Sequence, residues 1–243
     1  MKIGLLIPST SNGRDWKTVD ESYLFQYTIN TFLQTMDPEH DYVFYIGIDR
    51  GDRIYDNPTE FNKINMLISM HPNISICSVY MDGVEKGYLT KMWNILFKRA
   101  HDDNCDYFFQ CGDDIAFKTN GWVNECISTL ERSDGIGMTG PINNNARILT
   151  QTFVSRKHME FFGFYFTEEL INWYCDDWIN GVYKKHNKFF PLLNHICENL
   201  GGAPRYNVNN DIYFKSHFIK KQRILEEKCA RLVELYYNNI LHK

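Results

Sequence analysis

The first half of the chain alternates short apolar runs with segments in which apolar residues recur every three or four positions. Apolar runs that end at Gly, Pro, Asn or Asp predict buried strands, and the wider spacing predicts amphipathic helices. The predicted strands cover residues 3–8, 42–48, 74–80 and 107–110, and the predicted helices cover 21–36, 59–70, 88–100 and 120–130. Strands that alternate with helices predict βαβ units and a mostly parallel sheet.

The second half of the chain is less regular. Its predicted strands cover residues 136–141, 149–155 and 189–196, and its predicted helices cover 156–162, 176–186 and 216–241. The segment 215–243, which contains the last of these helices, carries seven Lys or Arg and three Glu, and the helix has an apolar stripe. Such a helix either packs its stripe on its own core or touches an anionic membrane surface. We expect a single α/β domain with helices on both faces of the sheet and a mixed second half.

Composition and charge narrow the class of protein. The chain is 44% hydrophobic and 23% charged, with a net charge of −4. These values are ordinary for a globular protein and disfavour a general nucleic-acid binder. The seven cysteines form no C-x-x-C pair, which speaks against a disulfide framework and a structural zinc site. The apolar run at the start of the sequence is too short for the apolar region of a signal peptide, and no apolar run approaches the length of a membrane span. We therefore expect a cytoplasmic protein.

The strongest chemical signal is Gly112-Asp113-Asp114, which follows the predicted strand at 107–110. Adjacent carboxylates repel each other unless a cation or strong hydrogen-bond donors compensate them. Mg²⁺ and Mn²⁺ are bound by one or two carboxylates together with substrate phosphates. Ligands of open α/β sheets bind beyond the carboxyl ends of the strands. The pair therefore favours a metal and nucleotide site over a simple turn.

Other polar residues follow the neighbouring predicted strands. Asp49 can accept from a ribose hydroxyl or a base N–H, or can only form a turn. Thr10 and Arg14 lie in the loop after the first strand and can hold a base or a phosphate. Lys91 begins the third helix and can reach a phosphate, although helix surfaces carry Lys routinely.

A second acidic pair, Asp176-Asp177, lies between Trp173 and Trp178. Burial among aromatic residues raises the pKa of a carboxyl group toward the range useful for a general base. Aromatic faces beside carboxylates also suit sugar rings. The alternative is a helix N-cap, and one Asp can cap while the other acts as a base. His195 follows an apolar run and can ligate a metal, although an isolated His is more often structural.

These motifs together resemble the GT-A fold glycosyltransferases, most nearly the family 2-like inverting enzymes, over residues 2–213. The segment from Pro8 to Arg14 resembles the family's first strand and donor loop, which implies donor contacts for Pro8, Thr10 and Arg14. Asp49 stands at the place of the nucleoside-binding Asp. Gly112-Asp113-Asp114 resembles a variant of the D-x-D motif, with Gly in the first place. It implies that Asp114 contacts the metal and Asp113 the sugar or ribose.

The later motifs of the family have counterparts as well. Asp176-Asp177 resembles the Glu-Asp signature, which implies that Asp177 is the catalytic base and that Asp176 takes the place of the Glu. Trp173 and Trp178 then belong to the acceptor site. His195, with the downstream segment Asp211-Ile212-Tyr213, resembles the family's late metal-ligand His.

The resemblance implies a hexosyltransferase that uses Mn²⁺ or Mg²⁺. It moves a sugar from a nucleotide diphosphate sugar, with UDP favoured, to a hydroxyl of a glycan or another acceptor, with inversion. Residues 1–118 would form the nucleotide-sugar half, 119–213 the acceptor half, and 214–243 a C-terminal helix. Lys91 and Asp113 would join the donor site.

Two other interpretations stay open at this point. A Gly-Asp-Asp sequence after a strand also occurs in the palm of RNA-templated polymerases, although 243 residues leave little room for fingers and thumb. A non-catalytic protein that binds nucleotide sugars or carbohydrates can share the same fold, because fold does not establish chemistry.

Overall fold

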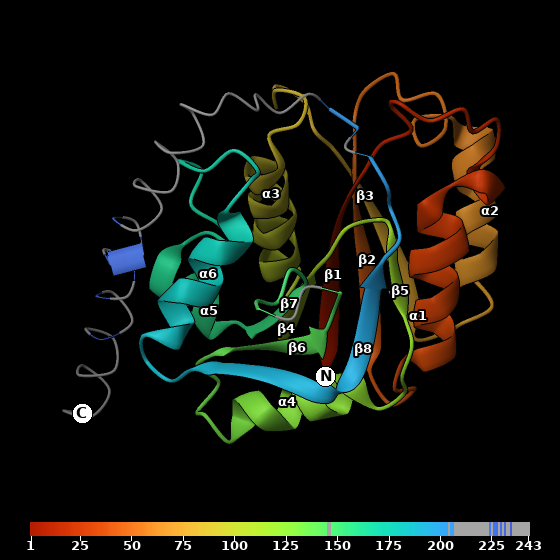
Figure 1. The fold of residues 1–243 in the computed structure, drawn as a ribbon. Coiled ribbons are helices and arrows are strands. Elements are labelled where there is room, and N and C mark those ends of the chain that lie inside the picture. Colours follow the sequence, from red (N-terminus) through yellow and green to blue (C-terminus); the bar gives the residue numbers. More distant parts are fainter. Residues whose placement is uncertain are drawn as a thin grey trace.

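The computed structural model describes residues 1–144, 147–203, 205, 206 and six isolated positions between 224 and 234. Apart from those isolated positions, the predicted helix at 216–241 lies outside the described residues, as do Asp211-Ile212-Tyr213. The described part has a curved sheet with helices on both sides (Figure 1).

The predicted parallel strands form the first half of this sheet. They are β1 (Lys2–Ser9), β2 (Asp41–Ile48), β3 (Ile74–Tyr80) and β4 (Tyr107–Gln110). β1 lies between β2 and β4, and β3 lies beyond β2, with every neighbour parallel. Their carboxyl ends therefore meet at one edge of the sheet, as the alternation of strands and helices predicts.

The second half continues the sheet with mixed strand directions. The described residues form eight strands in the order β3-β2-β1-β4-β7-β6-β8-β5. β7 (Thr152–Ser155) is antiparallel to β4 and to β6 (Met138–Ile142). β8 (Phe189–Asn199) is parallel to β6 and antiparallel to β5 (Ile115–Phe117). The expected α/β architecture with a mixed second half is confirmed.

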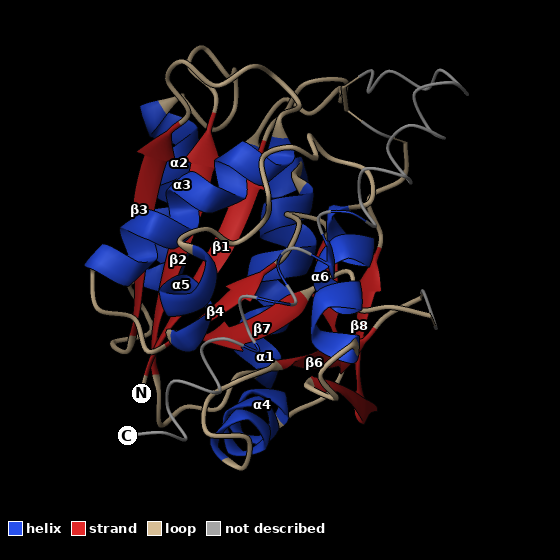
Figure 2. Cartoon of the chain, turned by 90° about the vertical axis from the view of Figure 1, so that its left-hand side faces the viewer, coloured by secondary structure: helices blue, strands red, loops and turns tan. Residues whose placement is uncertain are grey.

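Helices cover both faces of the sheet (Figures 1 and 2). α1 (Asn30–Thr35), α2 (Pro58–Ile68) and α4 (Trp122–Glu131) share one core with Leu5, while α3 (Leu89–Asp102), α5 (Lys157–Phe162) and α6 (Cys175–Lys184) share the other with Leu6. Successive strand residues point to opposite faces, which is why β1 is apolar throughout. Within the described residues, no helix has both the length and the hydropathy to cross a membrane.

The predicted helix at 21–36 is not continuous. A π-helical segment, Leu24–Ile29, precedes α1. The Thr28 Oγ1 accepts a hydrogen bond of 3.0 Å from the Ile115 amide, and the Thr31 Oγ1 accepts one of 2.9 Å from the Phe117 amide. These hydroxyls satisfy backbone donors on the edge of β5 that does not face β8. β5 itself is absent from the sequence prediction, since three residues give no readable period.

Acid should destabilise the protein through His158, which is buried between α5 and α6. Its Nδ1 lies 2.7 Å from the Tyr183 hydroxyl and its Nε2 lies 2.9 Å from the Tyr165 carbonyl oxygen. Burial lowers the pKa of His158 from 6.5 to about 4. Between these values the unfolded chain binds a proton that the folded chain excludes, so stability falls as the pH drops from 6.5 to 4.

We expect this loss to reach up to about 3 kcal/mol. Urea unfolding at pH 7.5 and 4.5 measures it, and a His158→Gln variant should show a smaller loss between the two pH values. His71→Gln is the control, since His71 lies at the surface between α2 and β3. An unchanged pH dependence in His158→Gln would contradict the assignment.

Candidate active site

The carboxyl ends of β1, β2 and β4 open onto a cavity of about 570 Å³. The loop after β1 contributes Thr10 and Arg14, β2 is followed by Asp49, and β4 is followed by Asp113 and Asp114. The cavity is also lined by Pro8, at the end of β1. The structure thus brings together the strand-end residues that the sequence singled out.

The opposite wall comes from the second half of the chain. Asp176 faces the cavity from the first turn of α6, with Trp173 just before that helix. The rest of this wall is rich in amide and hydroxyl side chains, namely those of Asn144, Thr150, Gln151, Asn172 and Asn199. Within this wall, the buried Asn180 joins α6 to the segment at Leu149. Its amide accepts from the Leu149 N–H and donates to the carbonyl oxygens of Leu149 and Asp176.

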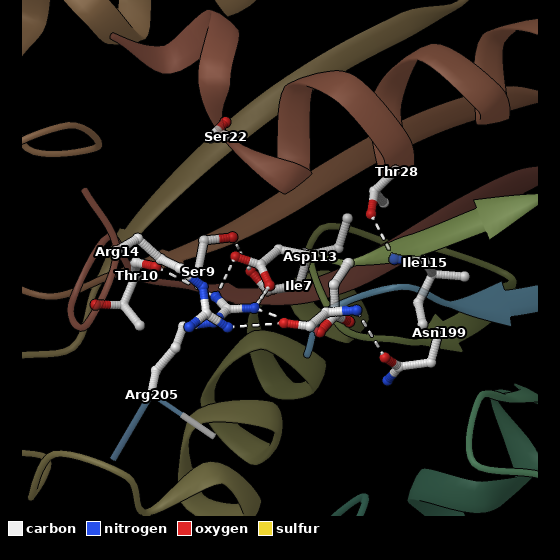
Figure 3. A network of polar contacts seen from close by, with 12 residues as sticks. Ile7, Ser9, Thr10, Arg14, Ser22, Thr28, Asp113, Ile115, Asn199 and Arg205 are labelled. Carbon is white, nitrogen blue, oxygen red and sulfur yellow. Dashed lines mark hydrogen bonds and ion pairs between the residues drawn. The ribbon is translucent and has the colours of Figure 1, made fainter. Parts of the chain in front are cut away.

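Arg205 forms an ion pair with the first carboxylate of the Gly112-Asp113-Asp114 motif (Figure 3). Its guanidinium donates to both oxygens of Asp113 and to the Thr10 carbonyl oxygen, the latter at 3.2 Å. It also lies 3.5 Å from Asp114 Oδ2. The Asp113 side chain is only 2% exposed and that of Arg205 only 13%. Arg205 therefore supplies the compensation that a buried carboxylate pair requires.

Tyr206 lines both the main cavity and a smaller one of about 240 Å³. The two cavities share Thr10, Arg14, Asp49 and Tyr206. The Tyr206 hydroxyl donates to Asp49 Oδ2 at 2.5 Å and lies 3.1 Å from Thr10 Oγ1. Burial, followed by its bond to Asp49, raises the pKa of Tyr206, so it stays a neutral donor. Three of the predicted nucleotide residues, Thr10, Arg14 and Asp49, thus line both cavities.

Asp114 lines the main cavity, and its carboxylate lies close to the backbone at Gly112 and Gly201. A Cβ built on Gly112 would approach its carboxylate to 2.4 Å, and one built on Gly201 to 1.7 Å, so neither position accepts a side chain without movement. Burial, with repulsion from Asp113, raises the pKa of Asp114 to about 6. A divalent ion bound mainly by substrate phosphates needs only one or two protein carboxylates, and Asp114 fits that role.

Asp176 and Asp177 differ in their surroundings. Asp176 lines the cavity and Asp177 does not. Burial, with repulsion from Asp177, raises the pKa of Asp176 to about 6. Asp176 Oδ1 also accepts from the Asp177 amide at 3.1 Å, close to the start of α6. The residue facing the cavity is therefore the one that the resemblance put in the Glu place.

The structure does not bring His195 to the cavity, which corrects its assignment as a metal ligand. His195 lies inside β8 rather than at its end, because the strand continues to Asn199. Its Nε2 lies 2.8 Å from Glu125 Oε2 and its Nδ1 lies 3.1 Å from Thr119 Oγ1. Among the described residues, no group of three or more His, Cys, Asp or Glu is placed to hold a metal ion.

Two further predicted contacts also need correction. Trp178 lies on α6 and is fully buried in the core, where it packs near Phe162, Phe164 and Phe166, so it has no face for an acceptor. Lys91 lies on α3 but lines neither of the two cavities. Trp173, by contrast, is 51% exposed and lines the cavity, and its contact with an acceptor stays a prediction.

The sequence prediction missed Arg205 and Tyr206. They follow β8 after Gly201-Gly202-Ala203-Pro204, a Gly- and Pro-containing run that marks a loop. This loop reaches the Asp residues at the strand ends only because of the position of β8 in the sheet, and the sequence alone does not give that position. The amide-rich wall was missed as well, because isolated Asn and Gln carry no spacing signal.

The fold of the chain matches solved structures, although its sequence does not match a known family. No protein-family model and no curated protein matches the sequence. Solved structures of S. aureus TarS, a GT-A-type glycosyltransferase, do match the fold. TarS residues 1–349 with UDP-GlcNAc share 12% identity at a TM-score of 0.58, covering 91% of this chain and 66% of that one. The same fragment with UDP shares 11% identity at a TM-score of 0.53, covering 82% and 60%.

The chain therefore has the fold of a GT-A-type glycosyltransferase domain. It spans about 60% of the TarS fragment that was solved with UDP. Likeness at this level of identity establishes the fold, and the chemistry has to be argued from the residues of the site.

Replacing Asp176 with Asn should stabilise the folded protein at neutral pH. The folded chain keeps a proton on Asp176 between about pH 4 and 6 that the unfolded chain has released. Stability therefore falls as the pH rises through this window, and the loss is complete above it. Asn cannot ionise, so the variant should gain on the order of 1–2 kcal/mol at pH 7.5 and almost nothing at pH 3.5.

Urea unfolding at these two pH values checks the prediction. Asp177→Asn is the matched control and should gain less at pH 7.5, because its side chain does not face the cavity. An equal gain in both variants would show that the loss of stability at pH 7.5 comes from the pair of carboxylates rather than from Asp176.

Proposed function

We propose that the protein is a glycosyltransferase that moves a sugar from a nucleotide diphosphate sugar to an acceptor hydroxyl. One observation carries the proposal. In a glycosyltransferase-like fold, the Asp113-Asp114 pair and the half-buried Asp176 line the same cavity, the pair from the end of β4 and Asp176 from the start of α6. This arrangement supports the proposal, because a displacement reaction needs a donor site and a proton acceptor around one space.

The donor is proposed to lie along the groove formed by the two cavities. Its nucleoside fits the smaller cavity beside Asp49, its diphosphate the boundary near Thr10 and Arg14, and its sugar the larger cavity. The structures of TarS with UDP and UDP-GlcNAc support a uridine nucleotide as the first donor to test. The acceptor would enter beside Trp173 and the amide-rich wall, whose groups can both donate to and accept from sugar hydroxyls.

The expected Mn²⁺ or Mg²⁺ stays a prediction. Of the two metal residues predicted from sequence, Asp114 would hold the ion together with the donor phosphates, and His195 would not. When bound, such an ion would neutralise charge on the departing diphosphate.

Asp176 is proposed as the general base. Its carboxylate takes the proton of the acceptor hydroxyl while the hydroxyl oxygen bonds to the anomeric carbon of the donor sugar. The bond between that carbon and the diphosphate oxygen breaks, and the nucleoside diphosphate leaves with the electron pair. Attack from the wall opposite Asp113-Asp114 inverts the anomeric centre. A base of this kind contributes about 10²- to 10⁴-fold in rate.

Donor binding can be tested by thermal unfolding with UDP-GlcNAc, other UDP-sugars and GDP-sugars, each with and without Mn²⁺. Ligands that bind only the folded state stabilise it, by about 2.7 kcal/mol at 100 times Kd. We expect stabilisation by at least one nucleotide sugar. If every nucleotide sugar leaves the melting temperature unchanged while nucleoside triphosphates raise it, a nucleotidyltransferase is the better assignment.

The base assignment predicts different effects for the two members of the pair. Asp176→Asn should keep donor affinity within about threefold and lose transfer by about 10²- to 10⁴-fold. Asp177→Asn should keep most of the activity. For the unmodified protein, kcat/KM should rise with pH through about 6 and then level off, because the base must be ionised.

Transfer measured with the donor found above, over pH 5–8, tests this prediction. Loss in Asp177→Asn with retention in Asp176→Asn would assign the base to Asp177, as the resemblance implies. Tight donor binding without turnover in any variant, acceptors having been screened, would favour a non-catalytic binding protein.

A further inference from the structure

Arg205 is held at the site by an ion pair and by several hydrogen bonds. Its guanidinium bonds to Asp113 and to the Thr10 carbonyl oxygen, and its own carbonyl oxygen accepts from Asn12 Nδ2 at 2.6 Å. Arg14 bonds to the carbonyl oxygens of Gly201 and Ala203 at 2.7 and 2.8 Å. These bonds join the chain after β8 to the loop after β1 and to the end of β4. Arg205 is thus held over the strand ends (Figure 3).

The position of Arg205 matches the position of charge in a bound donor. Among the described residues that line the larger cavity, the cations are Arg14 and Arg205. Arg14 also lines the smaller cavity, and Arg205 donates to the carbonyl oxygen of Thr10, a residue that lines both cavities. A nucleotide sugar that spans the two cavities places its diphosphate between the nucleoside and the sugar, hence at this boundary. The planar guanidinium of Arg matches the paired oxygens of a phosphate as well as those of a carboxylate.

We infer that Arg205 binds the diphosphate of the donor, and that it exchanges from Asp113 to the phosphate oxygens when the donor enters. The inference rests on the proposed function. Without a donor, Arg205 compensates a carboxylate pair that is costly to leave buried and unpaired. When a donor is bound, its diphosphate pairs with Arg205 in place of Asp113. The Asp113 carboxylate can then accept a hydrogen bond from a donor hydroxyl. The same side chain then stabilises the negative charge of the leaving nucleoside diphosphate.

Calorimetric titration of the full chain with uridine, UMP and UDP tests the assignment, in EDTA and in Mn²⁺. Arg205→Gln should weaken UDP binding by about 10- to 100-fold, since charge-assisted hydrogen bonds are lost. It should leave uridine affinity within about twofold. Arg205→Lys should restore part of the UDP affinity, because the charge remains and the planar geometry does not. Arg50→Ala is the control for net charge, since Arg50 is exposed and pairs with Asp82.

Arg205→Gln leaves Asp113 buried without a cation and can fail to fold. The comparison is then made between Asp113→Asn and Asp113→Asn with Arg205→Gln, in which no carboxylate is left unpaired at that position. The added Arg205→Gln change should cause the same selective loss of UDP affinity.

Three outcomes would overturn the inference. Tighter UDP binding in Arg205→Gln would mean that Arg205 only pairs with Asp113 and hinders the nucleotide. Equal losses for uridine and UDP would make it a structural residue. Unchanged UDP affinity in the presence of EDTA would remove any role toward the diphosphate. If the unmodified protein binds neither UDP nor any nucleotide sugar, the proposed function itself is wrong.

Discussion

The site depends on the burial of two adjacent carboxylates at the end of a parallel strand. Asp113 is almost fully enclosed, and Asp114 is pressed between the backbones at Gly112 and Gly201. Leaving such a charge without a partner costs about 3–5 kcal/mol, a large share of the stability of an ordinary domain. Arg205 offsets this cost and in doing so holds the chain after β8 against the strand ends. The shape of the cavity follows from that ion pair.

Asp176 is half-buried beside a second carboxylate, and no cation among the described residues forms an ion pair with it. It faces the cavity from the first turn of α6 and shares its surroundings with Asp177, so its pKa is raised to about 6. Asn180 accepts from and donates to the segment at Leu149 and also bonds to the Asp176 carbonyl, which keeps the helix start in place. A carboxyl group with a raised pKa at a cavity is a candidate for a functional role, and this supports the base role proposed for Asp176.

The two carboxylate sites lie on opposite walls because of the way the sheet changes direction. β1, β2, β3 and β4 are parallel and bring their loops to one edge. β7 pairs antiparallel with β4, and the chain then reaches α6 and β8 on the far side of the same space. The likeness to TarS, at 11–12% identity, supports this arrangement as a fold.

Much of the fold was readable from the sequence, for a physical reason. Strands buried on both faces appear as continuous apolar runs, so β1, β2, β3 and β4 were placed to within one residue, and the polar residues after them marked the ligand edge. The candidate residues Thr10, Arg14, Asp49, Asp113 and Asp114 followed from that pattern alone, and they do line one cavity.

What the sequence did not contain was the pairing of distant residues. Arg205 and Asp113 are 92 residues apart, and His195 finds Glu125 across 70 residues, so no local spacing reveals either contact. The choice between Asp176 and Asp177 depends on the rotation of α6 against the sheet, and the burial of Trp178 depends on the same packing. Local patterns determine which segments are strands and helices; long-range packing decides which side chains face the cavity, because only packing sets the partners and the burial of each charge.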